Sequence, residues 1–565
     1  MKEDQSGRLL IIGLDGATFD LIRPWAAAGH LPNIARLLAE GVSAPLRSVP
    51  NMNSAPAWSS FATGLNPGQH GIFYFYEQVP GTYTKRYLNA SFRRGATFWR
   101  LLSEAGHRVG VINVPLTYPA EPVNGFMLAG LDTPGVDSPG FSHPPELAAR
   151  LRAEVGEYTI EPGIPGYMKG GRRDEAAARI FEAIDRRLAC ARYLMAREPW
   201  DLFLLVFTAT DAAQHFFWKD MDPSHPEHDP AEAARFGEVI FRTYRRLDEV
   251  VGELCAAAPD ATVMLMSDHG GGFNQRGAEY LNDWLADLGL LSWLSQRQST
   301  PSARELLIRF LGWVYRQVDR RLPRETKQRL VRLLPGVRER METAMAFEGI
   351  DWPRTRAYAF GARDDILINL AGREPQGTVQ PGREYEELRD FIIDRLYRTR
   401  DVASGEPVVE VAQRREEVYA GNRVERAPDI LIRWRTDRLI RGLYIPQEGQ
   451  PRPSVPPLSP SLNNGGHRPH GILILAGPEI RRGLILPEAS IMDLAPTILY
   501  RFDLPLPGEM DGRVLTDAFV PAYVAGRPVR AAEGEAHLSG LDGVDYDEED
   551  AAVIEERLRG MGYVE

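Results

Sequence analysis

Short runs of apolar residues, each bounded by polar residues, recur along the chain and predict buried strands. Three of them are Leu9 to Leu14 (LLIIGL), Arg108 to Val114 (RVGVINV) and the LFLLVF within Asp201 to Thr208. Thr262 to Met266 (TVMLM) and the ILILAG at 472–477 have the same character. Continuous apolar runs of this length are typical of strands covered on both faces, as in parallel sheets.

Helical spacing separates these runs. Pro32 to Glu40 places Ile34, Leu37 and Leu38 on one face. The segment from Tyr385 to Leu396 is also helix-like, and we expect it in a cap near the active site. The tail at 545–565 is acidic and then amphipathic, which predicts a final docked helix with its apolar face at Ile554, Leu558 and Met561.

Ser54 stands before a helix-compatible run, Ala55 to Thr63, within the stretch NMNSAPAWSSFATGLNPGQHG. Serine is a favoured N-cap, and Pro56 suits a first helical turn. Backbone N–H groups and the positive helix end at such a position can bind an anion such as phosphate. Taken alone, the serine is more often an ordinary cap, so its functional interpretation depends on the residues described next.

Acidic and histidine side chains adjoin four of the apolar runs. They are Asp15 after the first run, Asp211 and His215 after the run that ends at 208, Asp268 and His269 after Met266, and His467 and His470 before ILILAG. Ligands of open α/β sheets bind at the carboxyl ends of the strands. Residues four apart on a helix share a face, as two ligands of one metal require, and the glycines after position 269 permit close approach. Each position alone has an ordinary explanation, but their recurrence at strand ends favours a metal site.

The composition is that of a soluble globular protein. The chain has 565 residues, more than one hydrophobic core supports, so we expect one large domain with insertions or two domains. A net charge of −11 provides no overall basic field for nucleic acid. Cys190 and Cys255 cannot form a disulfide framework, and there is no signal-peptide pattern or membrane-spanning run of about 18 apolar residues. These features predict a cytoplasmic location.

The segment 301–341 differs from the rest because it has eleven basic and four acidic residues. Apolar residues from Leu306 to Val318 follow helical spacing within it. The more common explanation is an insertion packed on the acidic remainder of the protein. The alternative is weak contact with an anionic membrane surface.

Several ordered motifs resemble the type I phosphodiesterase/nucleotide pyrophosphatase family of the alkaline phosphatase superfamily. They are IIGLDGATFD, SAPAWSSFATGLNPGQHGI, DAAQHF, SDHGGG, NLAGREPQGTV, APDILI, GGHRPHGILILAGPEI and DLAPTILYRFDLPLPGEMDGRVL, and only Leu285 to Glu348 lies largely outside them. The resemblance implies an α/β fold with a doubly wound, mostly parallel sheet, a helical insertion and a small cap. We expect a catalytic core at 1–284 and within 349–530, the latter with the cap segment, a basic insertion at 285–348, and an acidic tail with a helix at 531–565.

The resemblance also implies a hydrolase with two divalent metal ions. One ion would be held by Asp15, Ser54, Asp268 and His269, and the other by Asp211, His215 and His467. The family pattern places its histidine before Arg-Pro, which favours position 467 over 470 and leaves the role of His470 open. Mixed carboxylate and imidazole ligands suit Zn2+ best, with Mn2+ or iron as alternatives.

The expected reaction is attack by Ser54 on phosphorus, followed by hydrolysis of a phospho-serine intermediate. The substrate would be a small phosphoester, either a diester or a nucleotide pyrophosphate. Threonine is usual at this position in nucleotide pyrophosphatases, so the subclass stays open. No Lys or Arg occurs between Arg47 and Lys85, which favours a singly charged diester over a monoester.

Three further residues are candidate substrate contacts. Asn113 could bind phosphate, and Trp58 or Phe73 could contact an apolar group of a diester. The run Phe73-Tyr74-Phe75-Tyr76 could stack on a nucleobase. A strand with half of its rings in the core is the more common arrangement for such a run.

Other functions remain as alternatives. Ser54-Ala55-Pro56 matches the start of a sulfatase signature, but Trp58 replaces its arginine, and an Asp-His pair stands where sulfatases tend to have Asp-Asn. A phosphomonoesterase, or a phosphotransferase or mutase of the same superfamily, would use the same ligands. A catalytically silent binding protein on this fold is less compatible with the complete ligand set. The oligomeric state is not indicated by the sequence.

Overall fold

A large central sheet organises the structure, which is a computed structural model describing residues 7–294, 349–361, 363–456, 461–532 and 543–561. From one edge to the other, its strands are β19 (Leu484–Ile485), β2 (Val42–Arg47), β18 (His470–Ala476), β9 (Thr262–Met266), β1 (Leu9–Leu14), β8 (Leu202–Phe207), β5 (Val109–Ile112), β6 (Gly125–Leu128) and β7 (Ser142–His143), with β20 (Ala489–Ser490) paired to β2. The five strands from β9 to β6 are mutually parallel. β18 is antiparallel to β9 and to β2.

The apolar runs predicted as strands are the strands of this sheet. Every residue of β1, β8 and β9 is buried, as expected for strands covered on both faces. Alternate residues of β1 face opposite sides: Leu10 and Ile12 lie in one core cluster, and Leu9 and Ile11 in the other.

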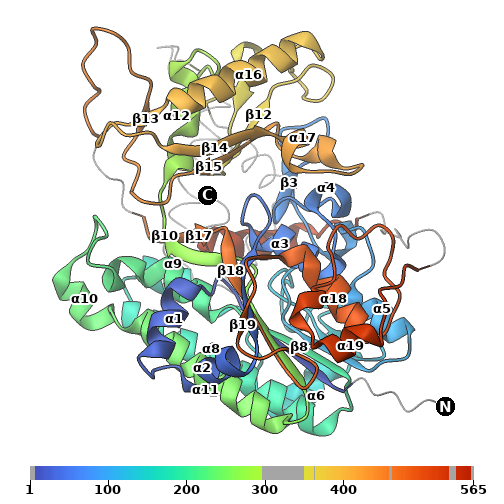
Figure 1. Cartoon of the computed structure of the whole chain (residues 1–565). Coiled ribbons are helices and arrows are strands. Elements are labelled where there is room, and N and C mark those ends of the chain that lie inside the picture. Colours follow the sequence, from blue (N-terminus) through green and yellow to red (C-terminus); the bar gives the residue numbers. More distant parts are fainter. Residues whose placement is uncertain (1–6, 295–348, 362, 457–460, 533–542, 562–565) are drawn as a thin grey trace.

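Helices cover both faces of the sheet, so the predicted doubly wound α/β fold is confirmed (Figure 1). One face packs against α1 (Phe19–Ala27), α2 (Pro32–Glu40), α8 (Arg173–Arg197), α9 (Ala209–Met221) and α11 (Val239–Ala257). The other face packs against α3 (Ser54–Thr63), α5 (Phe98–Glu104) and α18 (Leu494–Arg501). The predicted helix at 32–40 has the same bounds as α2. No helix among the described residues is long and apolar enough to cross a membrane.

A smaller antiparallel sheet forms a cap at the top of the molecule, above β10 (Gly270–Phe273), β17 (Gly465–Arg468) and α3 (Figure 1). Its strands are β11 (Ala357–Tyr358), β12 (Asp365–Ile368), β15 (Ile430–Trp434) and β14 (Val409–Arg414). α16 (Arg383–Arg398) packs on this sheet and contains the helix predicted at 385–396. The expected boundary at 284/285 falls within α12 (Leu281–Asp287), and the basic segment 301–341 lies outside the described residues.

The predicted terminal helix is α20 (Glu548–Gly560). Ile554 and Leu558 are buried in a cluster that also contains residues of the core and the cap, and Met561 packs against it. An Arg557 guanidinium N–H donates to the Leu131 carbonyl at 2.6 Å. The tail therefore docks on the body of the protein, as the spacing of its apolar residues predicts.

Candidate active site

The adjacency of three parallel strands brings the candidate ligands together. β1 ends immediately before Asp15, β9 ends just before Asp268 and His269, and β8 is followed by α9, which carries Asp211. These strands are neighbours in the order β9-β1-β8, so their carboxyl ends share one edge of the sheet. A two-stranded hairpin brings the fourth segment to this edge: β10 pairs antiparallel with β17, placing Gly271 opposite His467.

His269 lies at the centre of the first group of candidate ligands. Its Nε2 is 3.3 Å from Asp268 Oδ2 and 3.6 Å from Asp15 Oδ1. The same nitrogen is 3.1 Å from Ser54 Oγ. The side chains are buried, and Ser54 is only 1% exposed. The structure thus brings together the four residues expected to hold one ion.

Asp211 organises the second group. Its Oδ1 is 3.2 Å from His215 Nε2, one helical turn away on α9, and 3.6 Å from His467 Nε2. The two histidine Nε2 atoms are 3.0 Å apart. The groups adjoin, because the rings of His269 and His467 stack with centroids 3.7 Å apart. Ligand atoms of Asp211 also lie within 4.8 Å of those of Asp15 and His269.

The donor set fits divalent metal ions. Three buried carboxylates and three imidazoles converge, and two of the carboxylate oxygens, Asp15 Oδ1 and Asp268 Oδ2, have no hydrogen-bond partner among the described residues. Buried charges without partners are costly, whereas a bound cation would compensate them. Oxygen and imidazole nitrogen donors of this kind suit zinc and related metals.

The electrostatics of the bare side chains reflect this crowding. Burial, reinforced by the charges of Asp268 and Asp211, raises the pKa of Asp15 well above its usual value. Burial also raises the pKa of Asp268. Burial disfavours the charged form of His215, but the Asp211 carboxylate outweighs it and raises the His215 pKa to about 9. Burial, with the neighbouring His269, lowers the pKa of His467 well below its ordinary value.

Hydrogen bonds away from the cluster orient the three imidazoles. In each ring, Nδ1 lies against an oxygen: for His215, Asn463 Oδ1 at 2.7 Å and Gly465 O at 3.0 Å; for His467, Met52 O at 2.7 Å; and for His269, Gly270 O at 3.0 Å. A carbonyl oxygen only accepts, so Nδ1–H is the donor and Nε2 faces the cluster. This arrangement is typical of metal-binding histidines.

The start of α3 differs by one residue from the sequence prediction. Asn53, not Ser54, is the N-cap, because its Oδ1 accepts from the Ala55 N–H at 3.2 Å. Asparagine caps as well as serine does. Ser54 therefore begins the helix, and its hydroxyl lies 3.1 Å from His269 Nε2. Neither Asn53 nor Asn463 was predicted from the sequence, although asparagine is a favoured N-cap.

Of the remaining candidates, Trp58 contacts a residue of the Asp/His cluster. Trp58 is fully buried, and its indole N–H donates to Asp15 Oδ2 at 3.2 Å. Asn113 is buried with backbone φ 61°; its Nδ2 donates to Val206 O at 3.1 Å, and its Oδ1 has no partner among the described residues. Phe73 is 6% exposed and packs edge-on against Tyr419. His470 is exposed, with Nε2 at 2.8 Å from Glu488 Oε2.

The aromatic run 73–76 is not a continuous strand, since residues 73–75 form bends and only Tyr76 belongs to a strand, β3 (Tyr76–Gln78). All four rings are buried. The Arg363 guanidinium covers the Tyr74 ring at 3.6 Å and pairs with Asp365 at 2.9 Å. Arg373 is also neutralised, by Asp429 at 2.6 Å and Glu374 at 2.8 Å.

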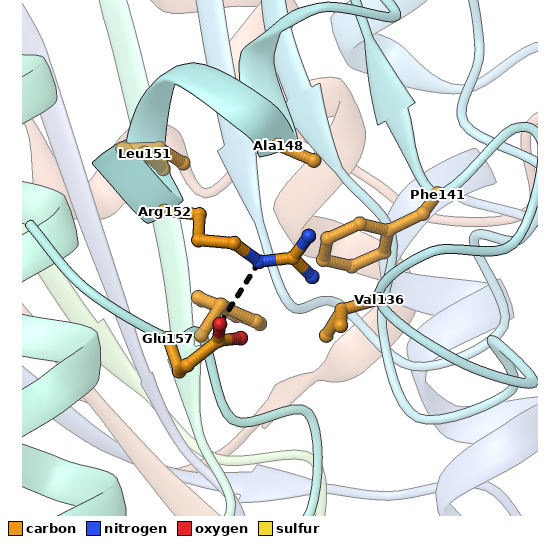
Figure 2. Close-up of a pocket in the computed structure, with 7 residues that line it drawn as sticks. Val136, Phe141, Ala148, Leu151, Arg152 and Glu157 are labelled. Atoms are coloured by element: carbon orange, nitrogen blue, oxygen red, sulfur yellow. Dashed lines mark ion pairs between the residues drawn. The ribbon is translucent and has the colours of Figure 1, made fainter. Parts of the chain in front are cut away.

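A small pocket elsewhere contains none of the candidate residues. It lies next to α6 (Leu147–Glu154) and is lined by Val136, Phe141, Ala148, Leu151, Arg152, Glu157 and Tyr158 (Figure 2). An ion pair of 3.0 Å joins Arg152 Nε and Glu157 Oε1 beside it. Because α6 lies at the end of the molecule opposite the cap (Figure 1), this pocket is separate from the Asp/His cluster.

No curated protein matches the chain. Among solved structures, an inactive variant of murine ectonucleotide pyrophosphatase/phosphodiesterase 5 with AMP is similar at 14% identity and a TM-score of 0.45, covering 91% of this chain and 100% of that one. Phosphonoacetate hydrolase from Sinorhizobium meliloti 1021 with phosphonoformate is similar at 16% identity and a TM-score of 0.49, covering 88% and 95%.

The family match is more extensive. The type I phosphodiesterase / nucleotide pyrophosphatase family matches residues 9–437, which include every candidate ligand except His467. The match shows that the chain is a phosphoester hydrolase of the nucleotide pyrophosphatase/phosphodiesterase type. The family is metal-dependent. On this match over most of its length, the chain belongs to the type I phosphodiesterase/nucleotide pyrophosphatase family.

Proposed function

We propose that the protein hydrolyses phosphodiesters or nucleotide pyrophosphates, with Ser54 as the nucleophile and two divalent metal ions, most suitably Zn2+. The observation that carries this proposal is the position of Ser54. Its hydroxyl is buried at the start of α3, 3.1 Å from His269 Nε2, in the group that adjoins the second Asp/His group. A serine placed there has its oxygen among metal ligands and beside a helix N-terminus.

The two groups of side chains divide the expected ions between them. Asp15, Ser54, Asp268 and His269 would hold one, and Asp211, His215 and His467 the other. When bound, two such ions increase the reactivity of the nucleophile and neutralise charge on the attacking and leaving oxygens of an in-line displacement. The fixed imidazole orientations described above support this assignment, because they direct Nε2 inward before any ion binds.

The chain's own part in the reaction is to supply and regenerate the nucleophile. Ser54 Oγ forms a bond to phosphorus while the bond from phosphorus to the leaving oxygen breaks, and the hydroxyl proton ends on the released group. Water then attacks the phospho-serine, the Oγ–phosphorus bond breaks, and Oγ regains a proton. The N-terminus of α3 favours the phosphate anion throughout.

Replacing Ser54 by alanine tests the proposal. Ser54→Ala should retain the fold and most bound metal but lower kcat by roughly a thousandfold or more, because it removes the atom that attacks phosphorus. Ser54→Thr, which preserves a hydroxyl, should retain a measurable part of the activity. Steady-state kinetics on a chromogenic diester and elemental analysis provide the two readouts.

Ser59→Ala is the matched control. Ser59 is buried on the same helix, and its hydroxyl donates only to the Ala55 carbonyl at 2.7 Å, so its loss should change activity by no more than a few-fold. Activity of Ser54→Ala within tenfold of the wild-type protein would remove Ser54 from the mechanism.

A further inference from the structure

Gln214 lies between the ligands Asp211 and His215 on α9 and is only 2% exposed. Its side-chain Nε2 donates to the backbone carbonyl of Gly16 at 2.8 Å. Gly16 directly follows Asp15, so this hydrogen bond joins α9, which carries one group of ligands, to the loop that carries a ligand of the other group.

Three glycines approach Gln214 so closely that no other residue fits them without a shift. A Cβ at Gly16 would lie 3.2 Å from Gln214 Nε2, and one at Gly271 only 2.2 Å from Oε1. A Cβ at Gly465 would lie 2.1 Å from the Gln214 carbonyl oxygen. Contacts under 3 Å are sterically forbidden, so glycine is required at 271 and 465 as the structure stands.

Each of these glycines lies within two residues of a candidate ligand in the sequence. Gly271 comes two residues after His269, and Gly465 two residues before His467. Gln214 is therefore in contact with the loop after β1, with β10 and with β17, while it belongs to α9 itself. One residue touches all the strand-end segments that supply aspartate and histidine ligands to the cluster.

Tyr244 of α11 also holds the Gln214 carboxamide in place. Its hydroxyl donates to Gln214 Oε1 at 3.5 Å and accepts from the Thr18 N–H at 3.2 Å. Tyr244 is buried, so this chain of hydrogen bonds is shielded from water. The carboxamide thus has one orientation, with its NH2 group toward Gly16.

We propose that Gln214 is a positioning residue that sets the spacing between the two Asp/His groups and thereby the affinity for the second metal ion. This inference rests on the proposed two-metal function. Two ions that act on one phosphate must be about 4 Å apart, and displacements of about 1 Å between supporting segments are enough to impair such a site. Gln214 holds the Asp15 loop and α9 at a fixed distance.

Metal binding by variants at 214 and 271 tests this role. Gln214→Ala should weaken binding of one zinc ion by at least about tenfold, measured by equilibrium dialysis with elemental analysis, with a corresponding rise in the zinc concentration for half-maximal activity. Gly271→Ala should be impaired too, since its Cβ meets the carboxamide. In the double variant the carboxamide is gone and the Cβ has space. Its zinc affinity should therefore be no lower than that of Gln214→Ala and should exceed that of Gly271→Ala.

Two more variants separate positioning from general destabilisation. Gln214→Met preserves volume without hydrogen bonds, so it should weaken zinc binding while it lowers the metal-free melting temperature by no more than the control variant does. Gln78→Ala is the matched control: Gln78 also makes two hydrogen bonds, to Thr82 O and from Tyr358, but on β3. It should lower the melting temperature and leave both zinc affinities unchanged.

The outcomes distinguish this inference from the function on which it rests. A wild-type protein that binds two ions, together with Gln214→Ala and Gln214→Met variants of the same affinities, would overturn the role of Gln214 alone. Strictly additive effects of the 214 and 271 substitutions would also overturn it. A wild-type protein that never holds more than one ion would overturn the two-metal proposal and this inference together.

Discussion

Asp211 Oδ1 lies between two imidazoles, whereas Asp15 and Asp268 both face His269. Removing one ligand should therefore affect the two ions unequally. Asp211→Ala and His467→Ala should lower the affinity for the same ion, and Asp15→Ala and His269→Ala should lower the affinity for the other. Each loss should be about tenfold or more. Elemental analysis of the four dialysed variants checks the assignment.

His470→Ala is the control for this series. His470 also lies in the NNGGHRPHG segment, but it is exposed and bonded to Glu488, so its removal should leave both ions in place. Equal loss of both ions from all four ligand variants would contradict two separable sites and would favour one joint site. Loss of an ion from the His470 variant would contradict the choice of His467.

The sequence predicted which aspartate and histidine side chains would lie together, but it did not predict most of the residues that orient them. Aspartate and histidine after an apolar run indicate chemistry by type and position alone. Asn463 orients His215 from 248 residues away, and nothing local in the sequence indicates that contact. Gln214 likewise resembles an ordinary polar residue of a helix, because its partners come from three distant segments.

The hairpin of β10 and β17 is the element that completes the site. Its strands come from positions nearly 200 residues apart, and Arg468 donates to Phe273 O at 2.8 Å across this pairing. A Cβ at Gly272 would lie 2.4 Å from the Arg468 guanidinium, so a larger residue there would displace this side chain. The sequence indicated close approach at these glycines but could not identify the partner strand.

Asp364, in the cap just before β12, provides a test at the level of this sheet. Its Oδ1 accepts from Trp434 Nε1 of β15 at 2.6 Å. Burial, with the neighbouring Asp365, raises the Asp364 pKa to about 7. The folded protein therefore retains this proton at pH values where the unfolded chain, with its ordinary aspartate pKa of about 3.9, has lost it. Stability from this group is complete below about pH 4 and is lost as the pH rises to about 7.

Asp364→Asn removes this titration while an amide oxygen can still accept from the indole. The variant should be more stable than the wild-type protein at pH 8, by roughly 1–3 kcal/mol, because no charge is buried. The difference should decrease as the pH falls and should be close to zero near pH 4. Thermal midpoints of both proteins across this range provide the measurement, and a difference independent of pH would show that ionisation of Asp364 is not responsible.

The core and the cap share one hydrophobic cluster, which contains Ala55 beside Ser54, Ile366 and Ile430 of the cap, and Leu558 of the terminal helix. The cap is therefore packed onto the segment that carries Ser54. The sequence predicted the sheet, its covering helices and a cap, because these depend on local periodicity and on ordered motifs. It did not predict the joint cluster, since packing between segments hundreds of residues apart leaves no periodic signal in either one.

The charge of the whole site argues for diesters over monoesters. With the two proposed divalent ions bound, four positive charges would face three negative ones from Asp15, Asp211 and Asp268, which would leave one positive charge. A diester brings one negative charge and a monoester dianion brings two. Three arginines are candidates to compensate the second charge: Arg94, Arg363 and Arg373. Arg363 and Arg373 are already neutralised by carboxylates, which leaves Arg94.

We therefore expect kcat/KM for bis-p-nitrophenyl phosphate to exceed that for p-nitrophenyl phosphate by at least about tenfold, or about 1.4 kcal/mol of transition-state stabilisation. Both substrates release the same chromophore, so one assay at a single pH and metal loading measures both. Ser54→Ala measured beside the wild-type protein removes any contribution from contaminating phosphatases. The expected preference arises from the charge of the monoester and not from incomplete occupancy by metal. The ratio should therefore persist at saturating zinc. A clear preference for the monoester would mean that a cation reaches the phosphate from another part of the chain, and it would favour a phosphatase or mutase activity.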